Sequence, residues 1–382
     1  MKVGIMTSGV LPVPAQKGGA VENLIDCYIE QNEIIGKHDF TIYSVSPIKK
    51  VRNTNHARYK YVNPNSFIYK LRRWVYCKIH KDTYYHPYTQ FFLHHFIDDI
   101  KHNKFDVIIL ENRPGYAIEL AKNTNAKIIT HLHTDSLDPN DERNKDVCRN
   151  TSMFITVSDY LKRRVLQIDS SAFIKTVYNG IDLNRFKDAK RKEKTKLSFC
   201  ETDFVLVYFG RISSIKGVKE ILMAMHLLNK YQDIKLLVIG SSTFSDTSFK
   251  DDYMNELCEL SKSIEDRIIF TGFVPYSEIP SYIKACDVAV LPSLCEEAFG
   301  LSMLEAMACD LPLITTNAGG IPEVCSDSCI LLERDNDLPN KIADSILSLY
   351  SKRTILETYN THKDISMFDK KIYAKNMIES IS

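Results

Sequence analysis

The stretch Glu297-Ala-Phe-Gly-Leu-Ser-Met-Leu-Glu305 follows a short apolar run, Asp287-Val-Ala-Val-Leu-Pro292. The run predicts a buried strand, and Gly300 predicts the start of a helix. A strand, a glycine turn and a helix together present backbone N–H groups to a phosphate in α/β proteins. The two carboxylates could hold a ribose or a sugar by accepting hydrogen bonds from vicinal hydroxyls. The alternative is a pair of solvated glutamates, and the matching features elsewhere in the second half favour the binding role.

The second half of the chain alternates strand and helix patterns around this stretch. Apolar runs that predict buried parallel strands occur at 204–209, 234–239, 267–270, 287–292, 313–315 and 330–332. Such an alternation is typical of a doubly wound α/β domain. The first half is less regular, with strand patterns at 3–6, 41–44, 107–110, 127–130 and 154–157. A turn signal at Tyr178-Asn179-Gly180 separates the halves and predicts two Rossmann-like domains, residues 1–177 and 178–382.

Length and composition narrow the class of protein. The chain has 382 residues, which is typical of two domains, and 49 Lys and Arg balance 48 Asp and Glu. This balance argues against bulk nucleic-acid binding. Ten scattered cysteines show no disulfide or zinc spacing and suggest a reducing compartment. No signal peptide and no apolar run of about 20 residues is evident. We therefore expect a cytoplasmic protein, with peripheral contact at the inner face of the cell membrane.

The expected membrane contact comes from local charge. Between Phe40 and Lys81 there is no Asp or Glu, while basic and aromatic residues alternate. This composition is typical of a surface for anionic lipid headgroups or for a phosphorylated lipid. The candidate membrane or acceptor face consists of Lys70, Arg72, Arg73, Trp74 and Lys78. A solvated basic surface is the alternative, and RNA binding lacks a recognisable RNA-binding module.

Charged residues follow the first strand of the second half. Gly210-Arg211 and Lys216-Gly217 lie where that strand turns into a helix, so Arg211 and Lys216 could neutralise a diphosphate. The spacing is not that of a P-loop, and no GxGxxG motif occurs, so a nicotinamide or flavin cofactor is disfavoured. Asp335-Asn336-Asp337 has the form of a metal-binding DxD, but its place in a polar turn before a helix favours a helix cap. We expect no metal and no cofactor.

The first half offers two motifs at strand ends. Gly18-Gly19-Ala20 follows the first strand, and small residues there allow the backbone to approach a ligand closely; a plain turn is the alternative. His131-Leu-His133 follows the strand pattern at 127–130, and alternation directs one ring toward the carboxyl-terminal edge of the sheet. A packed structural histidine is the alternative for His133.

These features together resemble a retaining glycosyltransferase of family 4, with a GT-B fold of two Rossmann-like domains facing across a cleft. The resemblance covers nearly the whole chain and rests most specifically on the Glu297/Glu305 pair. The other matching motifs are Gly18-Gly19-Ala20, His133, Val157-Ser158, Asn179-Gly180-Ile181-Asp182, Gly210-Arg211 with Lys216, Thr271-Gly272-Phe273-Val274 and Gly319-Gly320-Ile-Pro322-Glu323. Leu11-Pro-Val-Pro14 and Asn112-Arg113-Pro114 are also similar to bacterial spore-coat and surface-polysaccharide members.

The resemblance implies roles for individual residues. Arg211 and Lys216 would hold the diphosphate, and Glu297 and His133 would face the donor sugar; these four are the candidate catalytic residues. Glu305 would hold the ribose. The remaining candidate donor-binding residues are Gly19, Gly272, Phe273, Val274, Phe299, Gly300, Leu301 and Ser302. The segment 40–95 departs most from the family pattern, so the acceptor is the least determined partner.

The implied activity is transfer of a sugar from a nucleotide diphosphate sugar, most simply a UDP-sugar, to a glycan or lipid-linked acceptor in surface polysaccharide biosynthesis. Retention of configuration would follow from attack on the face that the diphosphate leaves. One alternative is a nucleotide-sugar epimerase, which gives no reason for the basic aromatic stretch. Another is a non-catalytic accessory protein on the same scaffold. Loss of Glu297, Arg211 or Lys216 would favour that scaffold, but all three are present.

Overall fold

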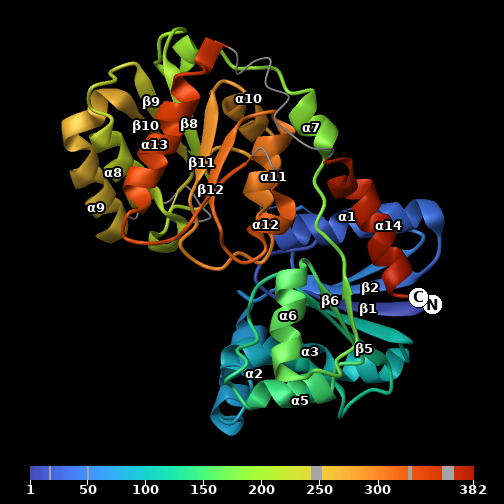
Figure 1. Cartoon of the computed structure of the whole chain (residues 1–382). Helices are drawn as coiled ribbons and strands as arrows, with labels where there is room; N and C mark the ends of the chain where they lie inside the picture. Colours follow the sequence, from blue (N-terminus) through green and yellow to red (C-terminus); the bar gives the residue numbers. More distant parts are fainter. Residues whose placement is uncertain (17–18, 50, 242–251, 326–328, 355–364) are drawn as a thin grey trace. The chain divides into compact units, whose positions relative to one another are not determined.

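The computed structural model describes residues 1–382 except 17–18, 50, 242–251, 326–328 and 355–364 (Figure 1). The chain forms two compact units. Unit 1 consists of Met1–Gly180 together with Met367–Ser382, and unit 2 consists of Ile181–Ser366. The segment from Met367 onward therefore differs from the expected domain division, which placed it in the second domain. The physical reason is the apolar face of the last helix, which is buried against the first helix of the chain.

Unit 1 is a parallel α/β sheet with helices on both faces. Its strands are β1 (Lys2–Met6), β2 (Asp39–Val45), β3 (Ala57–Val62), β4 (Val107–Glu111), β5 (Lys127–Leu132), β6 (Met153–Thr156) and β7 (Ile174–Thr176). Its helices are α1 (Ala20–Ile35), α2 (Phe67–Ile79), α3 (Pro87–Asn103), α4 (Tyr116–Leu120), α5 (Arg143–Arg149), α6 (Asp159–Ile168) and α14 (Lys370–Ser380). The strand order is β3-β2-β1-β4-β5-β6-β7, and all pairs are parallel.

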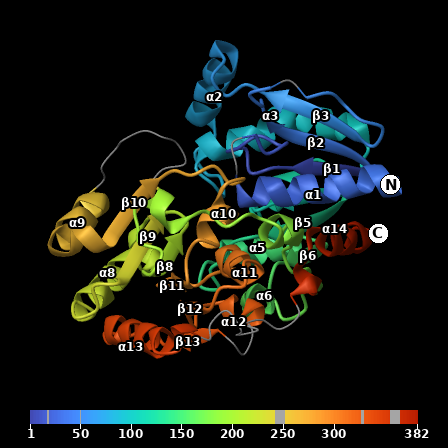
Figure 2. The same cartoon turned by 90° about the horizontal axis from the view of Figure 1, so that it is seen from above.

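Two cores sandwich this sheet. On one face, α1 and α14 lie side by side over the sheet (Figures 1 and 2), and Tyr28, Tyr373 and Met377 of these helices are completely or almost completely buried. On the other face, α2, α3 and α4 contribute Tyr69, Phe91 and other aromatic residues to the second core. The alternation of side chains along each strand supplies both cores from one sheet.

Unit 2 repeats this plan with its own sheet. Its strands are β8 (Phe204–Phe209), β9 (Ile234–Ile239), β10 (Ile268–Gly272), β11 (Val288–Leu291), β12 (Leu313–Thr316) and β13 (Ile330–Leu332). Its α-helices are α7 (Leu183–Lys187), α8 (Val218–Leu227), α9 (Asp252–Ser261), α10 (Ile279–Ile283), α11 (Leu301–Ala308), α12 (Ile321–Val324) and α13 (Leu338–Tyr350). The strand order is β10-β9-β8-β11-β12-β13, again all parallel. Figure 1 shows α8 and α13 next to each other, in agreement with their contacts.

The two parallel sheets confirm the predicted α/β class with two doubly wound sheets. Every strand pattern named from the sequence corresponds to a strand of the structure, with ends shifted by a few residues at most. The sequence patterns missed β3 and β7. The described helices include none long and apolar enough to cross a bilayer.

Candidate active site

The candidate site of unit 2 lies where its sheet changes direction of winding. Strand β8 has β9 on one side and β11 on the other, so the connections after β8 and β11 diverge at the carboxyl-terminal edge. Ligands of open α/β sheets bind at such a switch point. The connection after β8 contains Arg211 and Lys216, and the connection after β11 contains Glu297. The topology thus brings three of the four candidate catalytic residues to the same edge.

Lys216 and Glu297 are in direct contact. The ammonium of Lys216 donates to Oε1 of Glu297, and both side chains are about one-fifth exposed. The hydroxyl of Ser293 donates to the same oxygen at 2.8 Å. Glu297 is therefore an oriented carboxylate, and Lys216 is a cation held at the switch point.

Three backbone features support the contact between Lys216 and Glu297. The amide of Leu294 donates to the carbonyl of Ile215 at 2.9 Å, which joins the connections after β8 and β11. Gly217 has φ of 73°, and a Cβ there would stand 1.9 Å from the carbonyl oxygen of Pro292. The amide of Gly320 donates to the carbonyl of Glu297 at 2.7 Å. Only a residue without a side chain permits the approach at Gly217, so this glycine of the motif has a structural reason.

Glu305 lies in α11 and has a different environment. Its side chain is buried, and the hydroxyl of Tyr276 donates to its Oε1 at 2.7 Å. Burial raises the pKa of Glu305 to about 7, although the hydrogen bond from Tyr276 acts in the opposite direction. The residue is thus poised between a protonated and an ionised form near neutral pH. Glu297 and Glu305 contact different partners in the structure.

The remaining candidate donor-binding residues of unit 2 occupy the ends of strands and the start of α11. Arg211 is exposed and forms no ion pair with any described residue. Gly272 ends β10 with φ of 70°, and the ring of Phe273 beside it is 53% exposed, whereas Val274 is buried. Gly300 is the N-cap of α11 with φ of 103°. Phe299 is buried before it, and Leu301 and Ser302 form the half-buried first turn of the helix.

Unit 1 has its own switch point between β1 and β4. The guanidinium of Arg113, after β4, donates to the carbonyl of Ser8, after β1, at 3.2 Å. Gly19 is the N-cap of α1 with φ of 102°, where a Cβ would collide with the side chain of Glu22. Gly18 lies outside the described residues. Gly19 thus allows the conformation with which α1 begins.

His133 belongs to a buried cluster at the same edge. Its Nε2 lies 2.8 Å from Oε2 of Glu111, the last residue of β4. The hydroxyl of Tyr28 donates to the other carboxylate oxygen at 2.8 Å. Nδ1 of His131 is 3.0 Å from Oε2 of Glu111 but is not aligned for a hydrogen bond. The sequence analysis predicted His133 and missed its carboxylate partner.

The charges of this cluster follow from its burial. Burial, and then the neighbouring His131, lowers the pKa of His133 to about 4, so the ring is neutral at neutral pH. Burial alone would raise the pKa of Glu111, but His131 and the hydrogen bond from His133 together hold that pKa below its ordinary value. The cluster therefore contains an ionised carboxylate and a neutral His133.

Two groups have residue types that metals prefer. Ligand atoms of Glu111, His131 and His133 lie within 4.8 Å of one another. In this group Glu111 already accepts hydrogen bonds from Tyr28 and His133.

Asp337, of the DxD-like motif, is at the predicted N-cap position of α13, but its side chain makes no capping hydrogen bond. Asp335 forms an ion pair with Lys341 at 2.5 Å, and its other carboxylate oxygen accepts the amide of Asp337 at 3.0 Å in the turn before the helix.

The candidate membrane face lies on α2, which packs on α3 (Figure 2). Tyr69 and Tyr76 are its only buried residues. Large apolar side chains are exposed along the rest of the helix, with exposed fractions from 43% to 78%: Phe67, Ile68, Leu71, Trp74, Val75 and Ile79. Lys70, Arg72 and Lys78 are also exposed. Arg73 is the exception, because its guanidinium stacks 3.5 Å from the centre of the Tyr88 ring.

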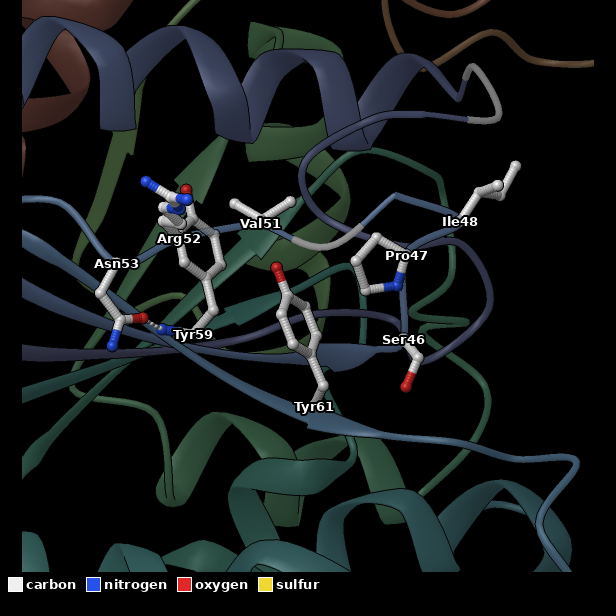
Figure 3. Close-up of a pocket in the computed structure, with 8 residues that line it drawn as sticks. All are labelled: Ser46, Pro47, Ile48, Val51, Arg52, Asn53, Tyr59 and Tyr61. Atoms are coloured by element: carbon white, nitrogen blue, oxygen red, sulfur yellow. Dashed lines mark hydrogen bonds between the residues drawn. The ribbon is translucent and has the colours of Figure 1, made fainter.

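Unit 1 also has an open cavity of about 620 Å³ below the connection between β2 and β3 (Figure 3). Tyr59 and Tyr61 rise from β3 into it, with parallel rings 5.8 Å apart. Pro47, Val51 and Arg52 are among the residues of the connection that line the opposite side. None of the candidate site residues named from the sequence lines this cavity.

Sequence reasoning missed three partners of the candidate residues: Glu111, Tyr276 and Ser293. Glu111 carried a signal, because it is the polar residue that ends the apolar run 107–110 and precedes the noted Asn112-Arg113-Pro114. Tyr276 carried none, because its contact with Glu305 joins residues 29 positions apart. Ser293 is an ordinary loop serine until the fold turns Glu297 toward it.

Comparisons with known proteins agree with this architecture. Residues 189–365 match the family of glycosyl transferases group 1, and residues 38–185 match glycosyltransferase family 4. A putative glycosyltransferase, YtcC, of Bacillus subtilis is 28% identical and is aligned over 96% of this chain and 88% of its own length. Spore coat protein SA of the same organism is 27% identical over 99% and 98%. A Salmonella typhimurium lipopolysaccharide 1,2-N-acetylglucosaminetransferase is 26% identical over 72% of each chain.

Solved structures share the fold. Anabaena Alr3699/HepE in complex with UDP and glucose has a TM-score of 0.71 at 19% identity, covering 100% of this chain and 99% of that one. Sucrose-phosphate synthase of Thermosynechococcus elongatus has a TM-score of 0.74 at 17% identity, covering 100% and 98%. Two parallel α/β units and these matches define a GT-B glycosyltransferase. More narrowly, the chain is a glycosyltransferase of the family 4 type, and so an enzyme.

Proposed function

We propose that this glycosyltransferase moves a sugar from a UDP-sugar to a glycan or lipid-linked acceptor in surface polysaccharide biosynthesis, with retention of configuration. The contact of Lys216 with Glu297 at the switch point of unit 2 carries the proposal. It holds a cation and a carboxylate at the edge where open α/β sheets bind ligands. The nearby start of α11 adds backbone N–H groups with a positive dipole end.

The reaction needs stabilisation of a leaving group more than a nucleophile. When the glycosidic bond breaks, negative charge develops on the nucleoside diphosphate and the sugar becomes oxocarbenium-like. Lys216 and Arg211 would stabilise that charge, so the proposal requires no metal ion. Glu297, held by Lys216 and Ser293, would accept hydrogen bonds from sugar hydroxyls. The departing phosphate would take the acceptor proton on the same face, which retains configuration.

UDP as the nucleotide part of the sugar donor is supported by the proteins that share the fold and by residues of α11. Alr3699/HepE, which shares the fold, was solved with UDP and with UDP-glucose. In this chain, Glu305 offers a carboxyl group to a ribose, and its present partner Tyr276 is a hydroxyl donor that ribose hydroxyls could replace. Contacts of Gly19 with the phosphate and of His133 with the donor sugar follow from the family resemblance and stay predictions.

The acceptor side of the proposal rests on unit 1. The Salmonella typhimurium relative is named as a lipopolysaccharide N-acetylglucosaminetransferase, and another relative is a spore coat protein, which agrees with surface glycans as products. The stacked Tyr59 and Tyr61 offer flat aromatic surface to an acceptor sugar in an open cavity, with Arg52 at its edge.

Helix α2 supports peripheral contact with an anionic membrane. Its exposed apolar residues and its lysines and arginines form the two components of an interfacial helix. Trp74, 61% exposed, has the side chain that prefers the headgroup level. Such contact would bring the enzyme to a lipid-linked acceptor.

Purified protein incubated with a panel of nucleotide sugars tests the proposed function. We expect a UDP-sugar to raise the melting temperature, because a ligand that binds the folded state stabilises it. The same sugar should be hydrolysed slowly without acceptor and transferred faster with membrane lipid extract. Binding without turnover would favour a non-catalytic scaffold, and interconversion of the free nucleotide sugar would favour an epimerase.

A further inference from the structure

The strongest feature that the proposed function leaves unexplained is the buried carboxylate of Glu111. It ends β4 at the switch point of unit 1, directly opposite His131 of β5 in the strand register. His133 follows β5 and turns its Nε2 toward Glu111. Glu111 and His131 are completely buried, and His133 is 9% exposed. A charged group in such a place needs a function or a strong structural reason.

The hydrogen bonds around Glu111 determine where the protons lie. An ionised carboxylate can only accept hydrogen bonds. Tyr28 donates its hydroxyl to Oε1, so the nitrogen of His133 that faces Oε2 must carry a hydrogen. Because the ring of His133 is neutral at neutral pH, its second nitrogen, Nδ1, then has a lone pair and no hydrogen.

Nδ1 of His133 is also buried and has no hydrogen-bond partner among the described residues. A buried acceptor without a partner is unfavourable, and a ligand hydroxyl would relieve it. His131 cannot supply a donor in this arrangement, because it packs ring against ring with His133 at 4.0 Å between centroids and its own nitrogens are unaligned.

The main chain of His133 is also held in place, in addition to its ring. Oδ1 of Asn112 accepts the amide of His133 at 3.3 Å and the hydroxyl of Thr134 at 2.9 Å. Asn112 has φ of 55°, a left-handed conformation that asparagine tolerates better than most residues. The end of β4 therefore fixes both the main chain and the side chain of His133.

We propose that Glu111 is a positioning residue, which holds His133 with hydrogen on Nε2 so that Nδ1 accepts a hydrogen bond from a substrate hydroxyl. This inference rests on the proposed function, because a sugar is the hydroxyl-bearing substrate. Glu111 itself touches no substrate. Its effect is to make Nδ1 of His133 an acceptor, which selects a hydroxyl over a carbonyl or phosphate oxygen at that point.

The test measures the tautomer directly. Protein labelled with ¹⁵N in its histidines gives two-bond proton–nitrogen correlations that distinguish Nε2–H from Nδ1–H, and His133→Gln assigns the signal. In the unmutated protein at pH 7 we expect the Nε2–H form. UDP-glucose, the probe ligand, should shift the Nδ1 signal. In Glu111→Gln we expect a mixture of tautomers and a turnover of UDP-sugar about 10- to 100-fold lower, the loss typical when a carboxylate that orients a metal-ligating histidine is removed.

The matched control is Glu119→Gln. Glu119 faces His94 at 3.4 Å in the same unit, so the substitution changes another glutamate–histidine contact and should leave the His133 signal and turnover unchanged. An Nδ1–H or doubly protonated His133 in the unmutated protein would overturn the proposal, even where Glu111→Gln fails to fold. So would stoichiometric bound metal released by His131→Ala. If no variant consumes a UDP-sugar, the proposed function fails, while the tautomer still decides the role of Glu111.

Discussion

Lys216 and Glu297 meet at one oxygen atom, although 81 positions separate them in the chain. Oε1 of Glu297 accepts from the ammonium of Lys216 and from the hydroxyl of Ser293. These two contacts orient the glutamate, and under the proposed function the lysine binds the diphosphate. When the charges of a site are placed before the substrate binds, the reaction requires little free energy for their reorganisation.

Replacing Lys216 should mainly slow the chemical step. The charge on the phosphate grows in the transition state, so Lys216→Ala should lower kcat by about 100-fold or more, with a smaller change in KM. Steady-state kinetics with the preferred UDP-sugar measure both constants. Lys219→Ala is the matched control, because Lys219 is a half-exposed lysine paired with Glu256 on the following helix. Equal losses in the two variants would remove Lys216 from the site.

Glu305 should make donor binding depend on pH. Its pKa of about 7 reflects burial of the carboxyl group. Ribose hydroxyls donate best to the ionised form, so binding lowers this pKa and releases a proton. Affinity should therefore be weakest below pH 6, rise through pH 7 and level off above pH 8, roughly one unit on either side of the midpoint.

Calorimetry with UDP-glucose suits the measurement, because its esterified diphosphate lacks the phosphate ionisation near pH 6. Glu305→Gln should bind more weakly and lose the pH dependence. Tyr276→Phe should move the midpoint upward, because it removes the hydrogen bond that lowers the pKa of Glu305. A pH profile that is the same in Glu305→Gln and the unmutated protein would contradict the ribose role.

Activity should persist without a divalent metal. Under the proposed function, Arg211 and Lys216 would supply the positive charge that a metal gives to other transferases, and the DxD-like residue Asp335 is paired with Lys341. We expect unchanged turnover after treatment with EDTA. Loss of activity in the chelator and its return with Mn²⁺ would show that the cations are insufficient.

Helix α2 should bind anionic vesicles in a salt-dependent way. Each Lys or Arg near an anionic surface contributes about 1 kcal/mol, so replacing Lys70, Arg72 and Lys78 with Ser should weaken binding by about 100-fold at low salt. Arg73 is left in place because it stacks on Tyr88. Co-sedimentation with phosphatidylserine vesicles measures the effect.

Two further variants of the protein serve as comparisons in the membrane experiment. Trp74→Ser should weaken binding that remains at high salt, because an apolar anchor is not screened. A variant with Ser at Lys196, Lys230 and Lys352, which are exposed in unit 2, controls for net charge. If both triple variants bind alike, or the unmutated protein ignores the vesicles, α2 is only a solvated surface and the acceptor is better sought among soluble glycans.

Helix α14 should stabilise unit 1. Met377 is completely buried, so Met377→Ala should destabilise the protein by about 2–5 kcal/mol and lower its melting temperature. Met367, which is 50% exposed, provides the control of the same residue type. A melting temperature equal in the two variants would mean that α14 is not part of the core.

The sequence predicted most of the fold because its central strands are long apolar runs. Strand β8, for example, is buried at every position and reads as such. Strand β3 was missed because strands were predicted only from continuous apolar runs, whereas Arg58 and Lys60 alternate with half-buried and buried residues, which is the pattern of an edge strand. Strand β7 has three residues, too few for a pattern.

The candidate site was predictable only as far as its residues follow strands. Lys216 and Glu297 could be named from their motifs, since the ends of parallel strands meet at one edge. Their contact could not be predicted, because it depends on how two loops pack against each other. Tyr276 and Glu111 acquire their roles from neighbours in space, and no spacing rule links them to Glu305 or His133.

The return of α14 to unit 1 affects the order in which the chain can fold during synthesis. Unit 2 is continuous, so all of its residues are synthesised before Tyr373 and Met377. The sheet of unit 1 must wait meanwhile with the apolar side of α1 uncovered. Domains usually mature from the amino terminus onward. Here the core of the earlier half stays incomplete until the helix made last has docked.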